Sequence, residues 1–141
     1  MENQQLLRDT YVEINLDSIA YNVKKIKEIV GDDVAIAAVV KADGYGHGAV
    51  NIAPSIMENG CEYLAVATLT EALELRNSYK DYKIIIMGYT PDEYLEHVVI
   101  NNITQTIFSL RQGQILNDLG RKHDKKPVVH IKYDTGFNRL G

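Results

Sequence analysis

Lys41 is the first residue of this sequence whose surroundings point to chemistry. It follows an almost continuous apolar run, residues 34–40, and precedes the stretch Gly44-Tyr45-Gly46-His47-Gly48. Burying an ammonium without a partner is costly. A lysine at this place therefore either extends its charged end into solvent or stays buried as a neutral amine, which can attack an aldehyde. The glycines allow a ligand to approach the backbone closely, although their spacing is not that of a P-loop.

A second group of charged residues lies near the end of the sequence, where residues 130–141 read HIKYDTGFNRLG. Asp, Gly and Asn are common in turns that follow strands, so a solvated turn is one interpretation. Arg139 supports another, because its planar guanidinium can bind anionic oxygens through two parallel hydrogen bonds. The residue types alone leave both interpretations open.

Both segments resemble motifs of the alanine racemase family. Residues 38–48, AVVKADGYGHG, are similar to the family's lysine motif for pyridoxal 5'-phosphate (PLP), and residues 130–141 are similar to its His-x-Lys-x-Asp-Thr-Gly-Met-x-Arg-Leu-Gly motif. The resemblance implies a PLP-dependent racemase that interconverts L-alanine and D-alanine, the latter for bacterial cell-wall peptidoglycan. PLP suits this reaction because its ring takes up the electrons that remain when the α-proton leaves.

The same resemblance implies roles for four residues. Lys41 would bind PLP covalently and act as one of two catalytic bases, and Tyr45 would hydrogen-bond the cofactor phosphate. Arg139 would bind the phenolic oxygen of the cofactor and the carboxylate of the substrate. Lys132 would be carbamylated, which turns a cation that repels Arg139 into an anion that can hold it. We expect no metal ion, because His97, His123 and His130 lack the ligand spacing of a zinc site.

Three residues near Arg139 depart from the family pattern. Tyr133 stands where an aliphatic residue is usual, Phe137 where methionine is usual, and Asn138 where glycine or another small or polar residue is common. These changes keep open a racemase of the same family that prefers serine or a larger amino acid. A non-catalytic PLP-binding barrel protein, or a decarboxylase with this barrel, is a further alternative, but the motif around Arg139 is not expected in either.

The elements that must position these residues alternate between strands and helices. Apolar, β-branched runs predict five strands, at residues 34–42, 63–68, 83–89, 103–108 and 128–133. Four helices are predicted between them, and Thr68, Thr90 and Ser109 are each followed three residues later by Glu or Gln, which predicts capping boxes. The run at residues 34–42 predicts a strand buried on both faces. A short strand over residues 11–16 and a helix from Asp17 to about Gly31 precede this series.

This alternation predicts an α/β fold with parallel strands and helical crossovers. The predicted caps follow the strands directly, on the face where β/α barrels hold their active sites, and a complete barrel takes about 250 residues. We therefore expect a partial TIM-type (β/α) barrel that stops after about the fifth strand. Residues 1–141 would be the N-terminal part of the PLP-binding domain, with a strand and helix over 1–31 and βα units over 32–141. The family's C-terminal β domain would be absent.

Composition excludes several other classes of function. A net charge of -4 with scattered basic residues argues against a nucleic-acid partner. The single Cys61 excludes an intramolecular disulfide and a cysteine-based zinc site. The apolar runs are too short to span a membrane, and the polar N-terminus lacks the apolar core of a signal peptide, so we expect a cytoplasmic protein.

The resemblance also implies an oligomer. In this family the second base is a tyrosine in the second domain of a partner subunit, so we expect a homodimer for the full-length enzyme. The 141-residue chain alone is expected to have little or no racemase activity. Its unpaired sheet edges favour self-association.

Overall fold

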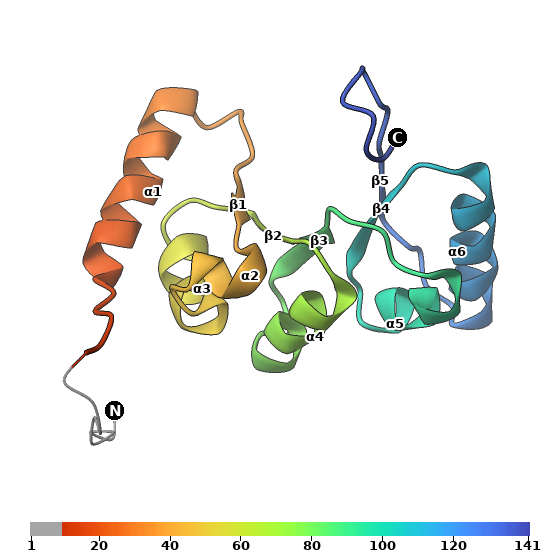
Figure 1. The fold of residues 1–141 in the computed structure, drawn as a ribbon, viewed down its shortest axis with the longest axis horizontal. Helices are drawn as coiled ribbons and strands as arrows, with labels where there is room; N and C mark the ends of the chain where they lie inside the picture. Colours follow the sequence, from red (N-terminus) through yellow and green to blue (C-terminus); the bar gives the residue numbers. More distant parts are fainter. Residues whose placement is uncertain (1–9) are drawn as a thin grey trace.

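The computed structural model describes residues 10–141, which form a five-stranded sheet with helices between its strands (Figure 1). The elements in chain order are α1 (Leu16–Val30), β1 (Ala37–Val39), α2 (Lys41–Tyr45), α3 (Ala49–Met57), β2 (Tyr63–Val66), α4 (Leu69–Ser78), β3 (Lys83–Ile86), η1 (Asp92–Tyr94), α5 (Leu95–Ile100), β4 (Thr104–Ile107), α6 (Leu110–Lys122) and β5 (Val129–Ile131).

Every neighbouring pair of strands is parallel, and the strand order in the sheet is the order in the sequence, β1-β2-β3-β4-β5. Each crossover between parallel neighbours carries at least one helix, because parallel strands need a long crossover connection, which is usually helical. The sheet is open, because β1 and β5 do not pair. The predicted α/β fold with parallel strands of a partial TIM-type barrel is therefore confirmed.

The core lies between the sheet and helices α3 to α6, which follow one face of it (Figure 1). Alternate strand residues point toward these helices because side chains on a strand alternate between its faces. Leu64, Val66, Ile84 and Ile86 are each at most 1% exposed. Full burial of such a side chain stabilises the fold by roughly 1.5–3 kcal/mol, so these central strands form its most stable part.

Side-chain caps at helix starts agree with the sequence in two places out of three. Thr68 and Glu71 form the predicted capping box at the start of α4. Ser109 caps α6 by accepting from the Gln112 N–H, but the Gln112 side chain donates instead to the carbonyl of Thr90. The predicted Ser109 box is thus half formed.

The predicted capping box at Thr90 is wrong. The helix starts later, as η1 and then α5, and neither element has a side-chain cap. Thr90 is buried, and its hydroxyl donates to Oε1 of Gln105 on β4, 2.8 Å away. A buried hydroxyl needs a partner, and the one it finds is a core amide rather than a helix N-terminus.

Two predictions about strands are also wrong. The segment predicted as a strand at residues 11–16 is irregular up to Asn15, whose side chain caps α1 by accepting from the Ser18 N–H. Strand β1 covers only three of the residues predicted at 34–42, and Val39 is 41% exposed. Within residues 10–141 β1 pairs only with β2, and its residues are exposed, half-buried and exposed in turn, so it is an edge strand that is not buried on both faces.

No helix among residues 10–141 is both long enough and apolar enough to cross a membrane.

Candidate functional site

The C-terminal ends of the strands carry the residues that the sequence singled out. Lys41 begins α2, separated from the end of β1 by Val40 alone, and Lys132 directly follows β5. Strand periodicity places residues 37 and 39 of β1, and residues 130 and 132 of the β5 segment, on the face away from the helices. This face is hollowed by about 320 Å3, with a lining formed by Ala37, Ala65, Ile85, Met87, Thr106, His130, Ile131 and Lys132.

The backbone after Lys41 forms a left-handed turn. Ala42, Asp43 and Tyr45 have φ of 51°, 52° and 56°. Gly44, before Tyr45, and Gly46, after it, also have positive φ. A left-handed conformation costs roughly 1–2 kcal/mol for each residue with a Cβ atom, so the surrounding structure must hold this turn. Backbone strain of this kind gathers at functional sites.

Hydrogen bonds stabilise the far end of this turn against helix α3. Asp43 Oδ1 accepts from the N–H of Ala49 at 2.7 Å, and the Asp43 carbonyl accepts from the N–H of Gly48 at 2.9 Å. The first of these bonds satisfies a backbone donor at the start of α3, where helices lack internal partners. The strained turn and the next helix are therefore built as one unit.

Lys41 itself lies between two anchored neighbours. The N–H of Val40 donates to the carbonyl of Ala65 on β2 at 2.8 Å, and the N–H of Ala42 donates to Oε1 of Glu71 at 2.7 Å. With the residue on each side fixed to a different element, the position of the Lys41 backbone is set by β2 and α4. This arrangement fixes where the lysine side chain leaves the sheet.

Glu71 is a residue of the site that sequence reasoning missed. Its Oε2 accepts from the N–H groups of Ala67 at 2.8 Å and Thr68 at 3.1 Å, while Oε1 holds Ala42. Partial burial raises the pKa of Glu71, but the hydrogen bonds from these three N–H groups and from Thr68's side chain outweigh it, and the pKa lies below its usual value. The sequence signalled the bond to Thr68 through the capping box and gave no sign of the bond to Ala42.

The Lys41 side chain is half-buried, between the two interpretations that the sequence left open. Within residues 10–141 no ion pair or hydrogen bond engages its amine. A lysine held at its backbone and unengaged at its amine can react with a carbonyl compound.

Lys132 is also half-buried, and its surroundings are defined by β3 and β4. Its amine donates to the carbonyl of Met87 at 3.3 Å, and its backbone N–H donates to the carbonyl of Ile107 at 2.8 Å. These bonds place the Lys132 amine over the C-terminal end of β3. Lys41 and Lys132 thus follow the two edge strands of the sheet, β1 and β5.

Tyr45 and Arg139 are more exposed to solvent than Lys41 and Lys132. Tyr45 is 61% exposed, and its positive φ directs it away from the core. Arg139 is exposed and places its guanidinium over the ring of Phe137, 4.8 Å from the ring centroid. In this structure the guanidinium therefore contacts an aromatic ring, whereas the sequence led us to expect it beside Lys132.

The segment after β5 is shaped by Asp134. Its Oδ1 accepts from the N–H of Gly136 at 2.8 Å, and this bond, followed by those from Asn138, Phe137 and Arg139, lowers the pKa of the carboxyl. Such aspartate turns are a common local substitute for a backbone turn. In Figure 1 this segment projects from the end of β5.

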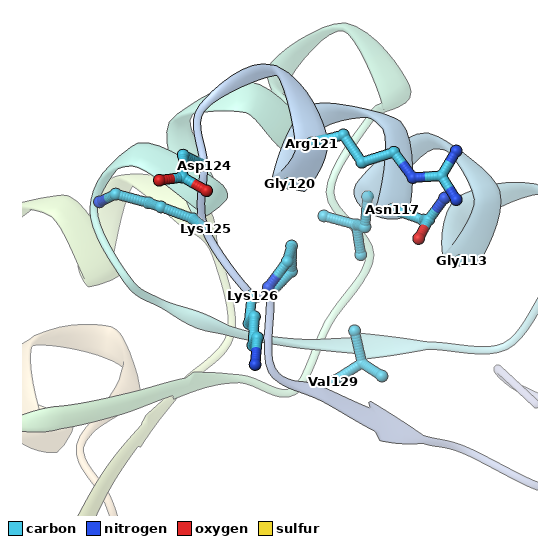
Figure 2. Close-up of a pocket in the computed structure, with 10 residues that line it drawn as sticks. Gly113, Asn117, Gly120, Arg121, Asp124, Lys125, Lys126 and Val129 are labelled. Atoms are coloured by element: carbon cyan, nitrogen blue, oxygen red, sulfur yellow. The ribbon is translucent and has the colours of Figure 1, made fainter.

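A larger hollow, of about 530 Å3, lies away from Lys41. It is formed between helix α6, with Gly113 and Arg121, and the segment from Lys126 to Val129 that enters β5 (Figure 2). Residue 129 has the strand parity opposite to 130 and 132, so this hollow belongs to the helix-bearing face. None of the residues that the sequence singled out lines it, and we place the candidate site on the other face.

The chain is similar to known proteins over almost its whole length. Residues 14–141 match the family described as alanine racemase, N-terminal domain. Over 135 residues the chain is 45% identical to alanine racemase 2 of Caldanaerobacter subterraneus subsp. tengcongensis, covering 96% of this chain and 35% of that protein. It is 46% identical to the alanine racemase of Clostridium perfringens over the same length, with the same coverage of each chain.

Solved structures agree with these relatives. The alanine racemase of Clostridium difficile 630 matches with a TM-score of 0.91 at 40% identity, covering 97% of this chain and 36% of that chain. The alanine racemase of Bacillus anthracis with bound L-Ala-P matches with a TM-score of 0.87 at 36% identity, covering 97% of this chain and 35% of that chain. The chain therefore spans little more than a third of the length of the relatives it matches.

Proposed function

Because this chain belongs to the alanine racemase family, as the match to its N-terminal domain over residues 14–141 shows, we propose that it supplies the PLP-binding part of an enzyme that interconverts L- and D-alanine. The observation that carries the proposal is the placement of Lys41. Its backbone is anchored on both sides at the end of a barrel strand, and its amine is unengaged within the described residues. In β/α barrels this end of the strands holds the catalytic groups.

The residues at the C-terminal ends of the strands fit PLP. The Lys41 amine suits the cofactor's aldehyde, and the exposed Tyr45 hydroxyl, on the same left-handed turn, suits its phosphate. The largely apolar floor formed by Ala65, Ile85 and Met87 suits a flat aromatic ring. When bound, PLP would withdraw electrons from the α-carbon of an amino acid and so acidify its α-proton.

The chain's own residues would then divide the work between binding and proton transfer. Lys41 Nζ would take the α-proton on one face of the substrate and return it there when the reaction runs in the other direction. Arg139 would bind the substrate carboxylate through its forked N–H groups, which requires it to leave the ring of Phe137. Carbamylation of Lys132 would create an anion close to the end of β3 that can hold Arg139 in that second position.

The proposal extends beyond the third of the relatives' length that this chain spans. We propose that residues 1–141 are the N-terminal part of the barrel domain, that a second β domain completes the enzyme, and that a base for the other face of the substrate comes from a partner subunit. The product D-alanine would serve bacterial peptidoglycan. The chain alone is expected to have little or no racemase activity.

A preference for alanine is supported by the names of the relatives and by the L-Ala-P bound in the Bacillus anthracis enzyme. A preference for serine or a larger amino acid is the second candidate, because the 77% exposed Phe137 lies against the proposed substrate arginine and the 84% exposed Tyr133 lies in the same segment after β5. These side chains are placed to limit or extend the space for a substrate.

The first experiment tests attachment of PLP to Lys41. The 141-residue chain is mixed with limiting PLP and reduced with borohydride, and the modified lysines are located by peptide mass mapping. We expect selective modification of Lys41, its loss in Lys41→Arg, and no change in Lys83→Arg, a control at an exposed strand position. Diffuse modification over many lysines would contradict the proposed site.

The second experiment tests the reaction. Residues 10–141 replace the matching segment of the Clostridium difficile enzyme, to which this chain is 40% identical, and racemisation of alanine and serine is measured. We expect activity with alanine that Lys41→Ala abolishes. A chimaera that is well folded and binds PLP but prefers serine would favour the second candidate.

A further inference from the structure

Both carboxylate oxygens of Glu71 accept hydrogen bonds. They connect α4 to the turn after Lys41 and to the segment between β2 and α4. Oε1 accepts from the N–H of Ala42 in the turn after Lys41 at 2.7 Å. Oε2 accepts from the N–H groups of Ala67 and Thr68, which lie between β2 and α4. The carboxylate therefore bridges the ends of two neighbouring strands on the side of the sheet where Lys41 lies.

A capping box does not account for this bridge. The box needs only the contact between the Glu71 carboxylate and the N–H of Thr68, which Oε2 supplies at 3.1 Å. The shorter bond to Ala42 crosses to a residue 29 positions earlier in the chain. It falls on the residue directly after Lys41, which is also the first of the left-handed residues.

The bridge is held by a charge that stays on Glu71. Within residues 10–141 no lysine, arginine or histidine forms an ion pair with it. Its partners are backbone N–H dipoles, which bind a carboxylate more strongly than a neutral acceptor. Because the N–H groups of Ala67 and Thr68 hold the Glu71 carboxylate in place, Ala42 has a fixed partner.

We propose that Glu71 is a positioning residue for Lys41, because its carboxylate holds the Ala42 N–H and so fixes the direction in which the Lys41 side chain leaves the end of the β1 segment. This inference rests on the proposed attachment of PLP to Lys41 and adds a residue that controls it. Glu71 acts only through the backbone of Ala42 and has no contact with the reacting atoms.

Two variants separate positioning from capping. Glu71→Asp keeps the charge at the start of α4 but is one methylene shorter, so it serves the Thr68 N–H and does not reach Ala42. Glu71→Gln keeps the length but removes the charge and places an amide donor against N–H groups. Glu74→Gln is the matched control, because Glu74 lies on the same helix and is exposed.

The first readout is hydrogen exchange of the Ala42 amide, measured by NMR on the 141-residue chain without PLP. We expect exchange at Ala42 to be about tenfold or more faster in both Glu71 variants than in the unchanged chain and in Glu74→Gln. In Glu71→Asp the amides of the first turn of α4 keep their protection. Equal exchange at Ala42 in all four proteins would overturn the proposal.

The second readout is the rate and selectivity of borohydride-fixed PLP modification at Lys41. Glu71→Asp is expected to slow modification of Lys41 about tenfold, while modification at exposed lysines stays the same. Full-rate, selective modification of Lys41 in a folded Glu71→Asp chain would overturn the proposal. Circular dichroism confirms that each variant is folded, and Glu71→Asp decides the matter if Glu71→Gln does not fold.

The two readouts keep the two proposals distinct. If PLP does not select Lys41 in the unchanged chain, the proposed attachment site fails, and the exchange of Ala42 alone decides whether Glu71 holds the turn. If PLP selects Lys41 equally well with and without Glu71, the attachment site stands and the positioning role fails.

Discussion

The hydroxyl of Thr90 donates a 2.8 Å hydrogen bond to Oε1 of Gln105, and both side chains are at most 1% exposed. The Gln105 amide in turn donates to the carbonyls of Gly88 and Thr106. Gln112 joins this network by donating to the Thr90 carbonyl, while its own Oε1 is buried with no hydrogen-bond partner in the described chain. A polar network in a core depends on every partner it has.

Thr90→Val is therefore expected to destabilise the fold although it conserves volume. It removes the donor to Gln105 Oε1, and an unsatisfied buried acceptor costs about 1–3 kcal/mol. Urea denaturation measures the free energy of unfolding. Thr70→Val, at an exposed position of α4, is the control and should change it by less than about 0.5 kcal/mol. Equal stability of the two variants would show that the Thr90 hydroxyl contributes nothing.

Arg76→Met should be more damaging than its position near a helix end suggests. Arg76 is only 7% exposed, and its guanidinium donates to the carbonyls of Tyr79, Lys80, Asn101 and Asn102, where α4 and α5 end. Hydrogen bonds from a charged group contribute about 1.5–3 kcal/mol, and we expect a loss of at least this size. The exposed Arg121→Met is the control, and chemical denaturation of both variants is the measurement.

Glu96 ties helix α5 to the end of α6 and should make stability depend on pH. Its Oε1 lies 2.7 Å from Lys122 Nζ and 2.6 Å from His123 Nε2, and these bonds, Lys122 first, lower the pKa of Glu96 to about 2. A carboxyl with a lowered pKa stabilises the fold above its unfolded pKa of about 4.5. That contribution is lost as the pH falls from about 4.5 to about 2.

The measurement for Glu96 is the melting temperature from neutral pH down to about pH 2. The difference between the unchanged chain and Glu96→Gln should shrink over the acid part of this range, because the carboxyl becomes neutral there. Glu93→Gln, at an exposed carboxylate of η1, serves as the control. A difference that is constant with pH would rule out the ion pairs as its source.

Two glycine-to-alanine changes should alter the stability of the fold in opposite directions. A Cβ on Gly88 would collide with the carbonyl oxygen of Ala67, where the ends of β2 and β3 lie side by side, and overpacking of this kind costs about 1–3 kcal/mol. A Cβ on Gly113 meets only the Ile107 side chain at 3.6 Å. Gly113 lies inside α6, where alanine is favoured by about 0.5–1 kcal/mol. Thermal unfolding distinguishes the two, and a Gly88→Ala protein as stable as Gly113→Ala would contradict this account.

The sequence predicted the order and type of the barrel elements because the signals for them are local. The five apolar runs all lead to strands, and the pairing of Thr68 with Glu71 is the capping box that the spacing indicated. Periodicity and caps involve neighbours within a few residues, and a single sequence is sufficient to show them.

What the sequence did not predict depends on contacts between distant residues. Thr90 has the spacing of a helix cap, yet a buried amide 15 residues later takes its hydroxyl. The Ala42 anchor on Glu71 spans 29 residues. The motif around Lys41 was found from the residues, but the carboxylate that holds its turn carried no signal beyond the local capping box.

The distance along the chain between Ala42 and Glu71 also sets an order of events during synthesis. A chain made from its N-terminus exposes Lys41 and the residues of the turn before β2 and α4 exist, so neither Val40 nor Ala42 has its partner. Parallel strands pair only after their long crossover has closed. The lysine amine of a nascent chain is consequently no different from any surface lysine, and it acquires a fixed direction only when the second βα unit has docked.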